Sequence, residues 1–179
     1  MKPQTVVQAF DVHLEQRGLR LEAVVIGGSA LVLMGVIARL TKDVDILAPE
    51  LPLAVREAAR AFAAERRAAG EDLQDDWLNN GAMSLGDVLP RGWQARVEVV
   101  FTGRAVLLRT LGRADLVKSK LFASADRGTD LEDCLALAPS AAELAEALPW
   151  LDRQDGNELW PAHVRASLAE LGRRLGHGV

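Results

Sequence analysis

The sequence predicts an α+β fold in which a small mixed sheet is flanked by helices and followed by a helical C-terminal region. Three observations predict it. Short runs rich in Val and Ile alternate with segments that have apolar residues every three or four positions. Glycine and proline separate these segments, and from Arg113 onward only helical patterns remain. We therefore expect a mixed α/β core over residues 1–110 and a helical extension over residues 111–179 that packs on it.

The expected elements of the first part follow from apolar spacing and from breakers. Apolar residues from Val6 to Leu19 form a helical stripe, and the run from Glu22 to Ile26 has the composition of a buried strand. We also expect a glycine turn at 27–28, a helix over 29–38, a strand over 43–47 and a helix over 53–69.

The remaining elements are expected on the same grounds. Residues 71–94 are polar and rich in turn residues, which predicts a loop with one short helix around Trp77. A strand hairpin follows, with its turn at Thr102-Gly103. Its strands are expected over 96–101 and 104–108, and the later helices over 113–126, 130–137, 141–150 and 158–174.

Composition excludes several classes of protein. The chain has 179 residues, 49% hydrophobic and 26% charged, which is typical of a globular protein. Its single cysteine, Cys134, excludes an intramolecular disulfide and a cysteine zinc site, and we expect it in the core. The formal charge of −4 provides no global attraction for nucleic acid or anionic lipid. The apolar run Ala23–Ala38 is shorter than the roughly 20 residues that span a bilayer, and no secretory signal precedes it. We expect a cytoplasmic protein without a membrane partner.

Two aspartates are the first candidate site. Asp43 and Asp45 are two positions apart on an expected strand, so their side chains leave the same face while Val44 and Ile46 leave the other. Two neighbouring carboxylates repel each other, and Mg²⁺, which prefers oxygen ligands, would compensate them. The alternative is a solvent-facing strand edge without a metal.

A glycine turn precedes the aspartates in the sequence and is a candidate site for phosphate. Gly27 and Gly28 would let backbone amides approach a phosphate closely, at the start of a buried helix. Ser29 either caps that helix or donates to a phosphate oxygen. Arg39 and Thr41 precede the aspartates directly, so they are candidates to contact a nucleotide or to brace the loop.

Glu98 is a candidate third carboxylate. Val97, Val99 and Phe101 are expected on one face of their strand and Glu98 on the other. If this strand lies beside the strand of Asp45, Glu98 would complete a cluster that binds metal or accepts a proton from an attacking hydroxyl. A cross-strand ion pair or a solvated side chain is the alternative.

A lysine in an apolar helix arc is the last candidate. Lys120 falls within the arc of Leu116, Val117 and Leu121, where a lysine is rare without a partner. A triphosphate or the helix neighbours Asp130 and Asp133 would provide the anion. The alternative is a lysine whose stem covers apolar surface. Arg127 is expected to form an ion pair with one of these aspartates.

These motifs together resemble a known superfamily. Ile26-Gly-Gly-Ser29 followed by Asp43-Val-Asp45-Ile46 resembles the signature of the DNA-polymerase-beta-like nucleotidyltransferases. The run from Gly35 to Asp45 is similar to small bacterial nucleotidyltransferases of abortive-infection and toxin–antitoxin systems. The later block, Leu116 to Ala123 with Arg127 and Asp130 to Asp133, also resembles those relatives, so the resemblance spans about residues 20 to 140.

The resemblance implies a nucleotidyltransferase fold and a metal-dependent reaction. Mg²⁺ or Mn²⁺ would assist transfer of a nucleotidyl group from a nucleoside triphosphate to a hydroxyl of an RNA, a protein or a small molecule, and a cognate antitoxin is an expected partner. A non-catalytic nucleotide-binding or protein-partner module of the same fold is the alternative. The expected catalytic and metal-binding residues are Asp43, Asp45 and Glu98, and the expected nucleotide-binding residues are Gly27, Gly28, Ser29, Arg39, Thr41, Lys120, Asp130 and Asp133.

Overall fold

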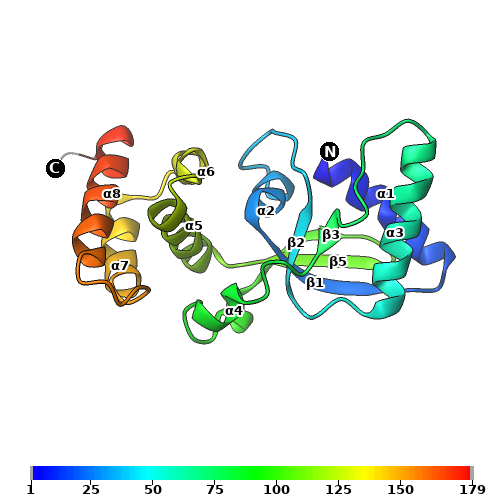
Figure 1. The fold of residues 1–179 in the computed structure, drawn as a ribbon, viewed down its shortest axis with the longest axis horizontal. Helices are drawn as coiled ribbons and strands as arrows, with labels where there is room; N and C mark the ends of the chain where they lie inside the picture. The colour runs from blue at the N-terminus through cyan, green and yellow to red at the C-terminus, as the bar shows by residue number, and fades with distance from the viewer. Residues whose placement is uncertain (1, 178–179) are drawn as a thin grey trace. The chain divides into compact units, whose positions relative to one another are not determined.

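The computed structural model describes residues 2–177 and divides them into two compact units (Figure 1). The first, which we call the sheet unit, contains the residues up to Asp87 together with Gln94–Leu111. The second, the helical unit, contains Val88–Trp93 and the residues from Gly112 onward. Each unit has its own cluster of buried apolar side chains, and no residue belongs to both clusters. The mixed α/β composition that the sequence predicts is confirmed.

The sheet unit is built on a five-stranded mixed sheet with the order β3-β2-β1-β5-β4. The central strand β1 pairs antiparallel with β2 and parallel with β5, and β4 closes the edge as the hairpin partner of β5. The two-residue strand β3 pairs parallel with β2 at the other edge. The strands are β1 (Leu21–Ile26), β2 (Val44–Ala48), β3 (Leu78–Asn79), β4 (Glu98–Thr102) and β5 (Val106–Thr110).

Two long helices bury one face of this sheet (Figure 1). They are α1 (Pro3–Gln16) and α3 (Leu53–Ala68), and their apolar stripes pack on alternate residues of the strands. Phe10 of α1 and Phe62 of α3 meet at 5.4 Å between ring centroids. Trp77 joins them, and its Nε1 donates to the carbonyl oxygen of Ala59 at 3.1 Å. The short helix expected around Trp77 is therefore wrong, because this residue is a fully buried anchor directly before β3.

Three short helical segments complete the first part of the chain. The helix α2 (Gly27–Leu33) begins directly at the end of β1 and is shorter than expected, ending before Gly35, whose φ is +74°. The other two segments are α4 (Leu85–Val88) and a 3₁₀ turn at Trp93–Arg96.

The helical unit contains the helices that the periodicity predicts. They are α5 (Arg113–Arg127), α6 (Leu131–Leu137), α7 (Ala141–Leu151) and α8 (Trp160–Arg174). Their common core includes Leu121, Leu151 and Val164. Cys134 lies in this core as expected, and burial raises the pKa of its thiol to about 12, so it is not a reactive nucleophile. Over the part of the chain that the structure describes, no helix is both long enough and apolar enough to cross a membrane.

Candidate functional site

The turn between β1 and α2 lies directly against an aspartate of β2. Ile26, the last residue of β1, pairs with Asp45 across the antiparallel ladder. The next residue, Gly27, has a φ of +75°, which residues with a Cβ rarely adopt. A Cβ placed on Gly27 would lie 3.2 Å from Oδ2 of Asp45. The backbone conformation therefore favours glycine here, a Cβ would in addition crowd the carboxylate of Asp45, and the turn and this carboxylate lie side by side.

An arginine and a threonine approach the second glycine. A Cβ on Gly28 would lie 3.0 Å from Nη2 of Arg39 and 3.5 Å from Cγ2 of Thr41. Thr41 also donates from its Oγ1 to the carbonyl oxygen of Asp43 at 3.2 Å. The loop after α2 thus returns to the glycine turn, and the hydrogen bond of Thr41 braces the backbone at Asp43.

The serine of the turn is directed inward. Ser29 is buried, and its hydroxyl donates to the carbonyl oxygen of Ile26 at 3.1 Å. The helix begins with Ile26 as its N-cap, without a side-chain cap, so the expectation that Ser29 caps this helix is wrong. Its hydroxyl proton is already engaged with the backbone, and we assign it a role in the shape of the turn.

The two aspartates keep access to solvent while their neighbours do not. Val44 and Ile46 are fully buried in the core of the sheet unit. Asp43 directly precedes β2, Asp45 is its second residue, and both are half-buried. The alternation expected from the sequence is therefore present, with the carboxylates on the side of the strand opposite to the core.

The expectation that the strand of Glu98 lies beside the strand of Asp45 is wrong. Two strands, β1 and β5, separate β4 from β2, which corresponds to about 14 Å at the usual strand spacing. The faces differ as well, because Glu98 pairs with the buried Thr110 on the core side of β5, whereas Asp45 pairs with Ile26 on the other side of the sheet. An irregularity between Val99 and Phe101 also breaks the alternation expected for this strand.

The aspartates therefore form a pair without Glu98. Within residues 2–177, no group of three or more His, Cys, Asp or Glu side chains is arranged to hold a metal ion. A pair of carboxylates still fits Mg²⁺, since this ion is commonly held by one or two protein carboxylates together with substrate phosphates. A metal at Asp43 and Asp45 would take its remaining ligands from water and from substrate phosphates.

The helical unit holds a second, separate group of charged residues. Nζ of Lys120 lies 2.8 Å from Oδ1 of Asp130 and 2.6 Å from Oδ2 of Asp133. Lys120 and Asp133 are buried, and Arg127 reaches Oδ2 of Asp130 at 3.0 Å from the surface. Lys120, for which the sequence predicts an anionic partner, thus has two carboxylate partners. Arg127 pairs with an aspartate as expected.

The charges of this group are mutually stabilised. Burial raises the pKa of the Asp130 carboxyl, but the hydrogen bond and the charge of Lys120, followed by those of Arg127, outweigh burial and hold this pKa below its ordinary value. Asp130 is therefore ionised at neutral pH, and Lys120 is occupied by protein carboxylates within its own unit. The glycine turn with Asp43 and Asp45 belongs to the sheet unit, and we describe the two groups separately.

Two asparagines that sequence reasoning treated only as turn residues also shape the site. Asn79 of β3 pairs with Asp45, and its Oδ1 accepts a hydrogen bond from the amide of Gly81 at 2.7 Å. Asn80 donates to the carbonyl oxygens of Ile46 and Pro49 and accepts from the amide of Leu51 at 2.8 Å. Asn79 therefore extends the sheet beside β2, and Asn80 fixes the segment that follows β2. The Asn-Asn-Gly sequence signalled a turn, but not the partners of its side chains.

Comparison with known proteins gives a family for the chain. The family model described as "Nucleotidyltransferase of unknown function (DUF6036)" matches residues 4–139, about three quarters of the chain. The match includes the glycine turn, the aspartate pair and the lysine group, and it ends before α7. No curated protein and no solved structure matches the chain.

Proposed function

The chain belongs to this nucleotidyltransferase family, and from that premise we propose that it transfers a nucleotidyl group from a nucleoside triphosphate to a hydroxyl acceptor, with Mg²⁺ or Mn²⁺ as cofactor. One observation carries the proposal. A glycine turn with a positive φ at Gly27 lies directly against the carboxylate of Asp45, so a turn that would bind phosphate is adjacent to a carboxylate that would bind a cation.

Asp43 and Asp45 would hold the metal. Their carboxylates are half-buried, and oxygen ligands of this kind are the ones that Mg²⁺ and Mn²⁺ prefer. When bound, the metal neutralises charge on the phosphates of the substrate. This assignment gives a role to two carboxylates that lie two positions apart, one directly before β2 and one within it.

Gly27, Gly28 and Arg39 would position the triphosphate. The absence of side chains on the glycines lets phosphate oxygens approach the backbone. The guanidinium of Arg39 is already directed at Gly28 and can donate two hydrogen bonds to one phosphate group.

The reaction then requires mainly positioning. The acceptor hydroxyl oxygen forms a bond to the α-phosphorus, the bond from that phosphorus to the α,β-bridging oxygen breaks, and pyrophosphate leaves with the bonding electrons. The hydroxyl proton is released to solvent. Positioning and charge stabilisation supply most of the catalysis in phosphoryl transfer, so few further side chains are needed.

The test is transfer of label from α-³²P-labelled nucleoside triphosphates. Intact protein with Mg²⁺ or Mn²⁺ is incubated in turn with RNA, protein and small-molecule extracts, so that the three classes of acceptor are compared directly. Asp43→Asn and Asp45→Asn are each expected to reduce transfer at least a hundredfold, while the matched control Glu98→Gln keeps it. Equal activity in the Asp45→Asn variant, or no binding of any triphosphate by calorimetry, would refute the proposal.

A specific observation also supports a second candidate, a nucleotide-binding or protein-partner module that performs no transfer. Glu98, the expected third carboxylate, lies on another strand and the other face of the sheet. A site with two carboxylates can bind a metal–nucleotide complex without activating an acceptor. Triphosphate binding that depends on Asp45, together with no transfer to any extract, would favour this candidate over the enzyme.

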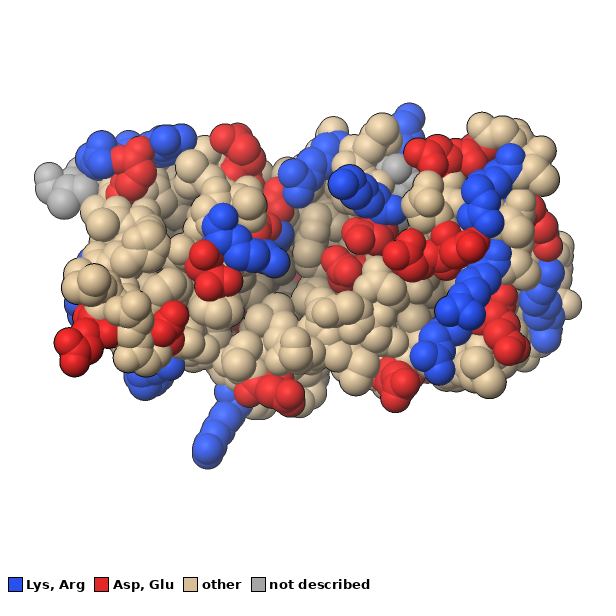
Figure 2. Space-filling model, viewed as in Figure 1, with Lys and Arg blue, Asp and Glu red and all other residues tan. Residues whose placement is uncertain are grey.

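We also propose a biological role in toxin–antitoxin or phage-defence systems, with a cognate antitoxin as partner and the cytoplasm as compartment. The support is the resemblance of the run from Gly35 to Asp45 to nucleotidyltransferases of such systems. Figure 2 shows acidic and basic side chains intermixed on the visible surface of each unit taken by itself. Growth arrest on induced expression, abolished by Asp45→Asn, is the expected result; normal growth at high expression contradicts this role.

A further inference from the structure

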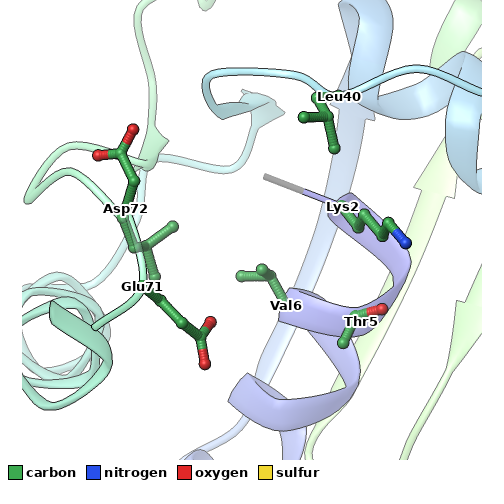
Figure 3. Close-up of a pocket in the computed structure, with 7 residues that line it drawn as sticks. Lys2, Thr5, Val6, Leu40, Glu71 and Asp72 are labelled. Atoms are coloured by element: carbon green, nitrogen blue, oxygen red, sulfur yellow. The ribbon is translucent and has the colours of Figure 1, made fainter. Parts of the chain in front are cut away.

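Leu40, a large apolar side chain, is exposed beside three hollows of the sheet unit. Its exposed fraction is 66%, and the hollows that it lines have volumes of about 370, 430 and 400 Å³. In Figure 3 it lies across the first of these hollows from Asp72, on the same side as Val6. Val32 and Ala38 line the third hollow with it. Apolar side chains that are exposed together, with polar residues around them, are a feature of protein–protein interfaces.

Opposite charges lie on the two segments that line the second hollow. Leu40, Thr41 and Lys42 line it from the loop before the aspartate pair, and Asp72 and Gln74 line it from the segment before β3. Lys42 and Asp72 are both exposed, and neither forms an ion pair with any residue in the range 2–177. Asp72 accepts a hydrogen bond from Nε2 of Gln74 at 2.8 Å. The hollow thus has an ammonium on one segment and a carboxylate on the other, and each can pair with an external group.

This arrangement of charges is complementary to a second copy of itself. A two-fold axis brings the same surface of two copies together, so a residue of one copy faces a different residue of the other. With the axis at the second hollow, Lys42 of one copy faces Asp72 of the other, and symmetry repeats the pair. The exposed Leu40 of each copy then enters the hollows of the other. A strongly acidic or strongly basic partner would attract one of the two charges and repel the other, so charge complementarity favours a second copy.

We propose that the surface formed by Leu40, Lys42 and Asp72 joins two copies of the chain in a two-fold symmetric dimer. Leu40 forms the apolar centre of the contact, and the two Lys42–Asp72 pairs belong to its polar rim. The contact covers the loop that leads to Asp43, the residue whose backbone Thr41 braces. The dimer goes beyond the proposed function and does not depend on it.

The oligomeric state of the intact protein tests the proposal, and sedimentation velocity over a range of concentrations measures it. The wild type is expected as a dimer that dissociates on dilution. Lys42→Glu and Asp72→Lys should each weaken the dimer by about tenfold or more, because like charges then face each other twice across the axis. Leu40→Asp should abolish the dimer, because it places a carboxylate in the apolar centre of the contact.

Exchange of the two charges tests the pairing itself. A mixture of the Lys42→Glu and Asp72→Lys proteins should form dimers again, because the new glutamate of one copy faces the new lysine of the other while the unchanged Lys42 and Asp72 also face each other. A single chain that carries both substitutions should dimerise as well. Glu57→Lys is the matched control, because Glu57 is an exposed carboxylate that lines none of the three hollows, and it should keep the affinity of the wild type.

Several outcomes would overturn the proposal. A wild type that stays monomeric at every concentration does so, since the hollows then have another occupant or none. A dimer that persists in Leu40→Asp, or single variants whose mixture does not dimerise, places any contact between copies elsewhere. Circular dichroism shows whether each variant is folded, and the chain with both exchanged charges keeps the test decisive if a single variant is not. Absence of nucleotidyl transfer refutes the proposed function instead and leaves the result on the dimer unchanged.

Discussion

Nζ of Lys120 and Oδ2 of Asp133 lie 2.6 Å apart in the helical unit, with both side chains buried. Asp130 is the second partner of this lysine, and Arg127 extends the group to the surface. Removing two charges from water is costly, and the attraction between them compensates only while both partners are present. The group therefore links α5 to α6 through Lys120, and replacing this one residue would remove the link.

We predict that Lys120→Ala lowers the free energy of unfolding by about 3–5 kcal/mol, since it leaves buried carboxylates without their cation. Urea denaturation followed by circular dichroism measures the change. Arg127→Ala is the matched control, because its side chain is 62% exposed and an exposed ion pair contributes about 0–1 kcal/mol. A loss of less than 1 kcal/mol in Lys120→Ala would show that the charged group contributes little to the stability of the helical unit.

We predict that alanine destabilises the fold at both Gly27 and Gly18, but weakens triphosphate binding only at Gly27. Gly27→Ala and Gly18→Ala should each destabilise the fold by about 1–2 kcal/mol, because both glycines have a positive φ, +75° and +64°. Only Gly27→Ala also crowds Asp45, since a Cβ at Gly18 would meet nothing within 4 Å. Triphosphate binding should therefore weaken at least tenfold in Gly27→Ala alone. Equal binding by the two variants in calorimetry would separate the turn from the nucleotide site.

Most elements could be predicted because their signals are local. The spacing of apolar residues predicted the strand ending at Ile26, the strand with Val44 and Ile46, and the helices from Arg113 onward. Lys120 stood out for the same reason, since a charge within an apolar arc implies a buried partner. These expectations depend on the chain within one element, or on neighbours a few residues away.

The failed expectations depend on tertiary structure. The position of Glu98 required the order of strands, and the chain places β4 beside β5 because they form a hairpin, not beside β2. Trp77 is buried by the distant Phe10 and Phe62, which no local pattern around it shows. Ser29 does not cap α2, because its hydroxyl donates to the carbonyl oxygen of Ile26, a contact that the local sequence does not show.

We predict that His13 makes the protein sensitive to mild acid. Its side chain is buried beside Phe10 and Phe62, and burial, followed by the charge of Arg17, lowers its pKa from the ordinary value of 6.5. The unfolded chain therefore takes up a proton near pH 6.5 that the folded chain does not. Stability is complete above this pH and decreases as the pH falls from 6.5 towards the lower pKa of the folded state.

The measurement for His13 is the free energy of unfolding between about pH 7 and pH 5. His13→Leu should lose less stability over this range than the wild type, because it has no group to protonate. Glu65→Gln should lose more, because Glu65, 3.3 Å from Nδ1 of His13, opposes the lowering of the pKa. Identical pH profiles of the wild type and His13→Leu would contradict the assignment.

The last prediction concerns Asp11, an aspartate of α1 that holds the hairpin of β4 and β5. Its carboxylate accepts hydrogen bonds from the backbone amides of Arg104, Ala105 and Val106 at 3.1, 2.8 and 2.7 Å. Burial raises the pKa of Asp11, but these hydrogen bonds together outweigh it and hold the pKa below the ordinary value of 3.8. The contribution of the ionised carboxylate is therefore present above pH 3.8 and is lost as the pH falls through the lower pKa of the folded state.

Asp11→Ala should lower the free energy of unfolding by about 3 kcal/mol at neutral pH, because it leaves three backbone amides without their acceptor. Asp11→Asn keeps one acceptor oxygen and should lose about half as much. Glu15→Ala, the matched control on the same helix, removes only the exposed pair with Arg104 and should change little. The difference between wild type and Asp11→Ala should shrink when unfolding is measured near pH 3. A difference that stays constant down to this pH would show that packing, and not the carboxylate, holds the hairpin on α1.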